Sequence, residues 1–221
     1  QINVPRDYWT QIIDIELPPI VRFERQGGGK EAIEKAAKLL SNAKFPVILS
    51  GAGVVIGDAI DDCKKIAEKL DAPVCNGYQH NDSFPGSHPL AVGPLGYNGS
   101  KAAMELISKA DVVLALGTRL NPFSTLPGYG IDYWPKNASI IQVDMNPDRI
   151  GLTKKVGVGI CGDAKMVSQQ IFEKLSSDAG DFGREDRKNL IHKTKSAWLQ
   201  TLTSLDHEDD DPGTVWNKEA R

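Results

Sequence analysis

The feature that most constrains the fold is a series of short apolar segments that alternate with helical patterns. Strand patterns occur at 45–49, 72–75, 111–116, 139–143 and 156–160, and helical patterns occur at 30–43, 59–70, 101–109, 164–175 and 185–202. Strands separated by helices form βαβ units, whose right-handed crossovers build a parallel sheet with helices on both faces. We therefore predict an α/β, doubly wound, Rossmann-like domain with a mainly parallel sheet of five or six strands. The sixth strand is expected near the first long loop.

The two ends of the chain differ from this middle part. Residues 1–26 carry three prolines and no helical period, and residues 177–221 are polar, with one helical pattern and an acidic run at 208–211. Such compositions are typical of connecting segments. We therefore expect the Rossmann-like domain to occupy residues 27–176, with a linker on each side.

Two long loops rich in glycine and proline follow predicted strands, the first beginning at Gly77 and the second at Gly117. In open α/β sheets, the loops that leave the carboxyl ends of strands bind ligands. The first loop carries Gln79, His80 and Asn81, and the second carries Arg119. A guanidinium at this position suits a phosphate or a sulfonate, and pairing of Arg119 with Asp132 or Asp144 is the equally favoured alternative.

The segment from Gly51 to Gly57 lies between a predicted strand and a predicted helix, where a dinucleotide-binding fingerprint would lie. Its spacing is G-x-G-x-x-x-G rather than G-x-G-x-x-G, so the third glycine is displaced. Glycines that only allow a tight turn, with no nucleotide bound, are therefore at least as well supported as glycines that hold a phosphate. Asp144 ends a predicted strand and suits either a ribose hydroxyl or a cap of the following turn. Gly51, Gly53, Arg119 and Asp144 are therefore candidates for a vestigial nucleotide site.

Composition excludes several classes of function. The net charge is −3, with acidic and basic residues mixed, which argues against nucleic acid and anionic membranes as partners. No apolar run approaches the length of a membrane span, and the first residues lack the pattern of a signal peptide. The three cysteines have no metal-type spacing, so we expect free buried thiols, a cytoplasmic protein and no metal ligands in these residues. Asp58 is expected to cap the helix at 59–70.

Four segments carry a resemblance to a known family: PVILSGAG, GYQHNDSFPGSHPLAVGPLGYNGS, ADVVLALGTRLNPF and IIQVDMNPDRIG. Together they resemble the central domain of thiamine-diphosphate-dependent enzymes, which include acetolactate synthase, pyruvate oxidase and oxalyl-CoA decarboxylase. The segment INVPRDYWTQIIDIELP and residues 77–135 are more specifically similar to the members that transfer an acetyl group from sulfoacetaldehyde to phosphate. The resemblance covers nearly the whole chain.

The resemblance implies an arrangement of three α/β domains. Residues 1–26 would include the end of a pyrimidine-binding domain, and residues 177–221 would lead to a diphosphate-binding domain. Those two domains would bind thiamine diphosphate and Mg²⁺, because the family's G-D-G metal motif is not matched at Gly162-Asp163-Ala164. The 221 residues alone are expected to be inactive and to bind no cofactor, with FAD or ADP as the less favoured alternative. The full-length enzyme would be a homodimer or homotetramer.

The reaction implied by the resemblance converts sulfoacetaldehyde and phosphate to acetyl phosphate and sulfite. Gln79, His80, Asn81 and Arg119 are candidates to line the assembled active site. Two alternatives remain open. One is the central domain of a related 2-oxo acid decarboxylase or ligase such as acetolactate synthase, and the other is a stand-alone nucleotide-binding module.

Overall fold

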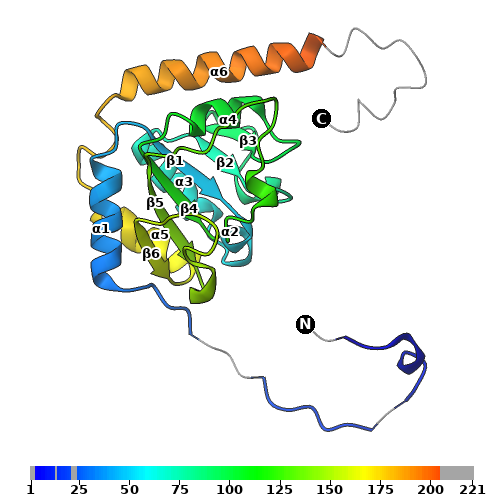
Figure 1. Cartoon of the computed structure of the whole chain (residues 1–221). Helices are drawn as coiled ribbons and strands as arrows, with labels where there is room; N and C mark the ends of the chain where they lie inside the picture. Colours follow the sequence, from blue (N-terminus) through cyan, green and yellow to red (C-terminus); the bar gives the residue numbers. More distant parts are fainter. Residues whose placement is uncertain (1–2, 13, 21–23, 205–221) are drawn as a thin grey trace.

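The computed structural model describes residues 3–12, 14–20 and 24–204. Its centre is a six-stranded parallel sheet with the strand order β3-β2-β1-β4-β5-β6 (Figure 1). The strands are β1 (Pro46–Ser50), β2 (Val74–Asn76), β3 (Ala91–Pro94), β4 (Val112–Leu116), β5 (Ser139–Asp144) and β6 (Val158–Cys161). The predicted fold class is therefore confirmed, and the expected sixth strand is β3, inside the first long loop.

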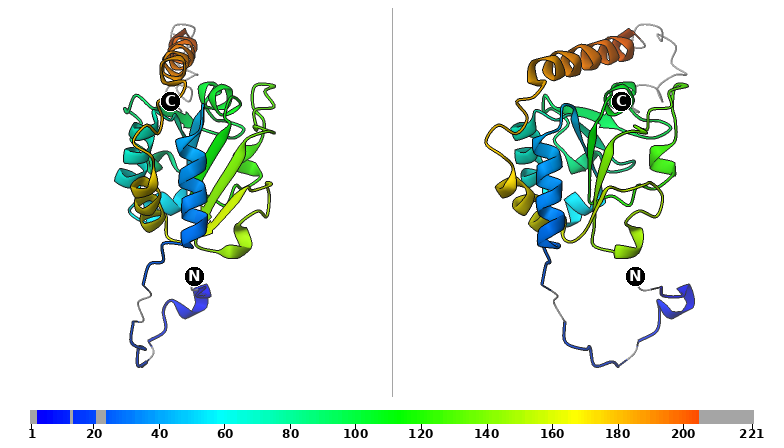
Figure 2. Two further views of the ribbon diagram at one scale, coloured as in Figure 1. Left: turned by 90° about the vertical axis from the view of Figure 1, so that its left-hand side faces the viewer. Right: turned by 60° about the vertical axis from the view of Figure 1, so that its left-hand side comes forward.

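Both faces of this sheet are covered by helices, namely α1 (Lys30–Ser41), α3 (Ile60–Leu70), α4 (Lys101–Ile107) and α5 (Ala164–Lys174). Two further helices are the short α2 (Ala52–Ile56) and the long α6 (Arg184–Ser204). The chain moves one way along the sheet from β1 to β2 and the opposite way from β3 to β4. Because both crossovers are right-handed, α3 and α4 lie on opposite faces. Helix α5 packs against both α1 and α3, so these three helices form one layer (Figure 2).

The central pair of strands explains why the apolar runs in the sequence are continuous. Every residue of β1 and of β4 is buried, and the two strands pair in register from Pro46↔Val112 to Ser50↔Leu116. Strands covered by helices on both faces show unbroken apolar runs rather than alternation. The core thus centres on the same two strands whose following loops carry the candidate site residues.

One local prediction is wrong, and one short helix was not predicted. Asp58 does not cap α3: the N-cap is Ala59, and Asp58 has φ 55° and pairs with Lys165 at 2.6 Å. This hydrogen bond to the Lys165 ammonium lowers the pKa of Asp58. The short helix α2 was not predicted, because its five residues include a glycine and too few turns for a helical period to show.

Helix α6 crosses the amino-terminal edge of the sheet, on the side away from the candidate site. It is held there by Arg187, whose side chain is 1% exposed. The guanidinium donates hydrogen bonds to five backbone carbonyls, those of Lys44, Leu70, Asp71, Gly180 and Phe182. This one side chain therefore joins α6 to the segments that enter β1 and β2.

Ser168 in α5 offers a simple test of the packing. Its side chain is fully buried, and its hydroxyl oxygen has no hydrogen-bond partner among the described residues. Because a buried hydroxyl without a partner is destabilising, Ser168→Ala should raise the free energy of unfolding by about 1 kcal/mol. Urea denaturation measures this change, and a loss of stability of similar size would show that the hydroxyl is bonded.

Candidate functional site

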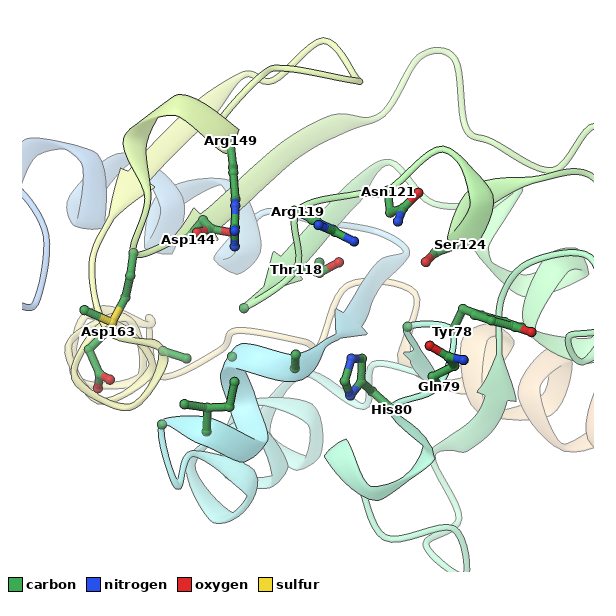
Figure 3. Close-up of a pocket in the computed structure, with 18 of the residues that line it drawn as sticks. Tyr78, Gln79, His80, Thr118, Arg119, Asn121, Ser124, Asp144, Arg149 and Asp163 are labelled. Carbon is green, nitrogen blue, oxygen red and sulfur yellow. The ribbon is translucent and has the colours of Figure 1, made fainter. Parts of the chain in front are cut away.

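A cavity of about 930 Å³ lies at the carboxyl ends of the strands, between the loops that follow β1, β2, β4, β5 and β6. The chain leaves β1 toward β2 on one side and reaches β4 on the other, so this is the point where the strand order reverses. Ligands of open α/β sheets bind at this point. The cavity therefore lies where the fold itself predicts a binding site (Figure 3).

The cavity brings together residues from widely separated parts of the sequence. Those that line it and carry polar side chains are Arg25, Tyr78, Gln79, His80, Thr118, Arg119, Asn121, Ser124, Asp144, Arg149 and Asp163. Figure 3 shows Thr118 and Arg119 on one side of the cavity, with Gln79 and His80 facing them from the loop after β2. The two loops singled out from the sequence thus form opposite walls of one site.

Five of the seven candidate residues line this cavity, namely Gly53, Gln79, His80, Arg119 and Asp144. The other two, Gly51 and Asn81, are not in its lining, although both lie in the loops that form it. The structure thus groups the candidates for the assembled active site and those for a nucleotide site at one place.

The glycines after β1 serve the contact between two loops. A Cβ atom on Gly53 would lie 2.7 Å from Cα of Gly117, and one on Gly117 would lie 2.7 Å from Cα of Gly53. The amide of Gly53 donates to the carbonyl of Gly117 at 2.8 Å, and the amide of Gly51 donates to Leu116 at 3.0 Å. A phosphate cradle needs amides that point freely at the ligand. These two amides are already used within the protein, which favours the role of tight-turn glycines.

Three arginines supply the positive charge of the site. Arg25 donates a hydrogen bond to the Gly57 carbonyl and lies 3.5 Å from Asp163. Within the described part of the chain, neither Arg119 nor Arg149 forms an ion pair. The two partners considered for Arg119 are engaged elsewhere, because Asp132 pairs with Lys136 at 2.9 Å and Asp144 accepts the amide of Asn146 at 2.8 Å. Arg119 is therefore available for an anion.

The cavity also includes residues that the sequence analysis did not select. Arg149 lies in the 3₁₀ turn after β5, inside the VDMNPDRIG segment, and Asp163 caps α5 by accepting the amides of Lys165 and Met166. Arg25 was assigned to a linker. Arg149 could have been selected, because it lies in the loop that directly follows the predicted strand ending at 143. The position of Arg25 depends on its contacts with Gly57 and Asp163, which no local pattern in the sequence reveals.

The described thiols and carboxylates form no cluster of metal ligands, and Cys161 is exposed whereas Cys63 and Cys75 are buried as expected. Burial raises the pKa of the Cys63 thiol to about 12 and raises that of Cys75 further, so neither is a nucleophile at neutral pH. Among residues 3–12, 14–20 and 24–204, no group of three or more metal-ligating side chains occurs, and no helix is both long and apolar enough to cross a membrane. Asp163, in the Gly-Asp-Ala segment, is already used as a helix cap. The described residues therefore supply no group of ligands for a magnesium ion.

Comparison with a family model identifies residues 33–171 as the thiamine pyrophosphate enzyme central domain. The chain is 76% identical over all 221 residues to a probable sulfoacetaldehyde acetyltransferase of Rhizobium meliloti and 74% identical to a sulfoacetaldehyde acetyltransferase of Roseovarius nubinhibens. It is 34% identical over 211 residues to a probable acetolactate synthase large subunit of Methanocaldococcus jannaschii, covering 92% of this chain and 33% of that protein. The chain spans 37% of the length of each of the first two relatives.

Solved structures agree with the fold. Benzoylformate decarboxylase from Polynucleobacter necessarius matches 80% of this chain and 33% of its own with a TM-score of 0.62 at 22% identity. A putative thiamin diphosphate-dependent enzyme from Mycobacterium smegmatis matches 72% of this chain and 31% of its own with a TM-score of 0.58 at 27% identity. Both likenesses concern about one third of a longer protein.

Proposed function

The chain belongs to the thiamine pyrophosphate enzyme family, whose central domain it contains, and on this premise we propose that it serves a thiamine-diphosphate-dependent acetyltransferase. The proposed reaction converts sulfoacetaldehyde and phosphate to acetyl phosphate and sulfite. The observation that carries this proposal is the identity of 64–76% over the whole chain to three relatives named for that activity, against 34% for an acetolactate synthase. The central domain of a 2-oxo acid decarboxylase or ligase remains the alternative.

We propose that the chain itself is a structural domain and that catalysis needs further domains of a longer polypeptide. The relatives are almost three times as long as this chain, which supports the proposal. Thiamine diphosphate and Mg²⁺ would be bound by those domains, and the lack of a metal-ligand cluster among the described residues supports this for Mg²⁺. The cofactor supplies the carbanion chemistry, while protein groups orient the substrate. A homodimer or homotetramer in the cytoplasm is part of the same proposal, and the three free thiols fit that compartment.

The residues of this domain would act on the substrates by holding them. Both substrates are anions, a sulfonate and a phosphate, and both favour guanidinium and amide donors. Arg119 has its guanidinium free among the described residues, and Gln79, His80 and Asn81 lie on the loop that forms the facing wall. We propose that these four residues reach the assembled active site and orient one of the two anions there.

Product analysis of the full-length enzyme tests the reaction. With thiamine diphosphate and magnesium, sulfoacetaldehyde should give sulfite and acetyl phosphate in equal amounts, and both should require phosphate. Release of sulfite without acetyl phosphate would contradict acetyl transfer. Decarboxylation of a 2-oxo acid without any sulfite would replace the proposed substrate while leaving the family unchanged.

Arg119→Met in the full-length enzyme tests the proposed anion contact. Loss of a hydrogen bond to a charged group costs about 1.5–3 kcal/mol, so kcat/KM for the anion that Arg119 holds should fall about 10- to 150-fold. Lys136→Met is the matched control, because this exposed cation pairs with Asp132 outside the cavity. Unchanged steady-state kinetics for both sulfoacetaldehyde and phosphate would remove Arg119 from the site.

The cavity at the strand ends also supports a second candidate function, the binding of a nucleotide by Gly51, Gly53, Arg119 and Asp144. Its volume and its position favour that reading, whereas the internal hydrogen bonds of Gly51 and Gly53 oppose it. We propose that the nucleotide site is vestigial. Titration calorimetry of the full-length enzyme with ADP and with FAD should then show no binding, and saturable binding of either would overturn this part of the proposal.

A further inference from the structure

Three buried polar side chains form a compact hydrogen-bonded cluster at the ends of β1 and β2. They are Ser50, the last residue of β1, Asn76, the last residue of β2, and Ser83, which ends the 3₁₀ turn after β2. Their exposed fractions are 0%, 4% and 0%. We call these three residues the loop clamp. None of them lines the cavity, and no part of the proposed reaction uses them.

The hydrogen bonds of the loop clamp are reciprocal. The hydroxyl of Ser50 donates to the carbonyl of Ser83 at 3.0 Å, and the hydroxyl of Ser83 donates to the carbonyl of Ser50 at 3.2 Å. The amide nitrogen of Asn76 donates to the hydroxyl of Ser83 at 3.0 Å and to the carbonyl of His80 at 3.3 Å. Networks in which buried groups satisfy one another fix a single arrangement, because any displacement leaves several of them unpaired.

The clamp holds both ends of the segment 77–82, whose first four residues line the cavity. The segment is tied at its start, where the amide of Gly77 donates to the carbonyl of Ser50 at 2.7 Å, and at its end by Ser83. Between these points Gln79 has φ 67°, a left-handed conformation that costs energy for a residue with a side chain. Such a conformation persists only where the surrounding structure imposes it, and it is frequent at functional sites.

We infer that Ser50, Asn76 and Ser83 are positioning residues, which hold the backbone of segment 77–82 so that Gln79 and His80 face the substrate. The inference rests on the proposed function of those two side chains. The clamp acts from behind the cavity wall: it touches the backbone of the loop and leaves the side chains of Gln79 and His80 free to point into the cavity. A displacement of about 1 Å in such a loop can lower a rate about 100-fold.

The test uses the full-length enzyme with four single variants, Ser83→Ala, Ser50→Ala, His80→Ala and Ser168→Ala. Ser83→Ala removes two bonds of the clamp, and Ser50→Ala removes one. Ser168→Ala is the matched control, because it also deletes a fully buried serine hydroxyl, but one with no partner among the described residues. The readouts are kcat/KM for sulfoacetaldehyde, KM for thiamine diphosphate, and amide hydrogen exchange of the peptide that covers 77–84.

The expected result has three parts. Ser83→Ala should speed amide exchange within 77–84 and lower kcat/KM for sulfoacetaldehyde about 10- to 100-fold, with KM for thiamine diphosphate unchanged. Ser50→Ala should show the same pattern with a smaller effect, and it carries the test if Ser83→Ala does not fold. Ser168→Ala should match the unmodified enzyme in all three readouts.

Two results would overturn the inference, and they differ. Faster exchange in 77–84 with unchanged kcat/KM, while His80→Ala lowers kcat/KM, would show that the loop needs no positioning. Unchanged kcat/KM in His80→Ala itself would show that this side chain does not contribute to the reaction. The premise then fails, and the positioning role fails with it.

Discussion

Arg187→Met should lower the free energy of unfolding by about 3–5 kcal/mol, the cost typical of breaking a buried charged network. The reason is the number of groups that depend on this guanidinium. Five backbone carbonyls accept hydrogen bonds from it, and the side chain is 1% exposed. A methionine would fill most of the volume but would remove all five hydrogen bonds, of which those to Leu70 and Gly180 are fully buried. Urea denaturation of the 221-residue chain, followed by circular dichroism, measures the change.

Lys188→Met is the matched control for this prediction. It removes a neighbouring cation on α6, whose side chain is 47% exposed and lies 3.8 Å from Asp71. Exposed ion pairs contribute about 0–1 kcal/mol, so this variant should unfold almost as the unmodified chain does. Equal losses of stability in both variants would mean that the positive charge of α6 matters and the buried hydrogen bonds do not.

Gly53→Ala should lower the free energy of unfolding by about 2–4 kcal/mol, within the range of severe overpacking. Its Cβ atom would lie 2.7 Å from Cα and 3.1 Å from the carbonyl oxygen of Gly117, and both of these are backbone atoms. Backbone cannot rotate away as a side chain does, so the loops after β1 and β4 would have to separate. The hydrogen bond from the Gly53 amide to the Gly117 carbonyl would lengthen as well.

Gly86→Ala is the control for this variant. An added Cβ atom at Gly86 meets nothing within 4 Å, and its φ is outside the left-handed region, so stability should change by less than about 0.5 kcal/mol. Gly53→Ala also distinguishes two roles of Gly53, close packing against Gly117 and binding of a phosphate group. A variant that is as stable as the unmodified chain and loses only nucleotide affinity would contradict the close-packing role.

The sequence was sufficient to predict five of the six strands, because the signal for each of these strands is local. Strands such as β1 and β4 are buried along their whole length and therefore read as unbroken apolar runs between helical patterns. The strand inside the first loop was expected but not placed, since β3 has only four residues and includes a glycine and a proline. Asp58 was misassigned because a side chain that suits an N-cap also suits an ion pair, and Lys165 lies more than a hundred positions away in sequence.

The sequence predicted which loops form the candidate site, but it predicted fewer of the contacts that complete it. Strand ends meet at one edge of a parallel sheet, so the proximity of Gln79, His80 and Arg119 follows from the strand pattern alone. The presence of Arg25 in the cavity lining could not be predicted, because it depends on a contact between segments far apart in the sequence. The amide of Asp163, at the start of α5, donates to the carbonyl of Gln26 and so places residues 24–26 beside the cavity. The loop clamp could not be predicted either. Serine and asparagine are common at strand ends, and only the burial of these three side chains in the structure indicates their role.

The measurement that tests the central claim most directly is the ratio of kcat/KM for sulfoacetaldehyde to kcat/KM for pyruvate, determined with the full-length enzyme, thiamine diphosphate, magnesium and phosphate. The two substrates separate the proposed acetyltransferase from the acetolactate synthase alternative. Sites built to pair with a substrate's polar groups reject analogues that lack them by large factors, so the ratio should exceed about 100. A ratio below one, with carbon dioxide released and no sulfite formed, would contradict the account.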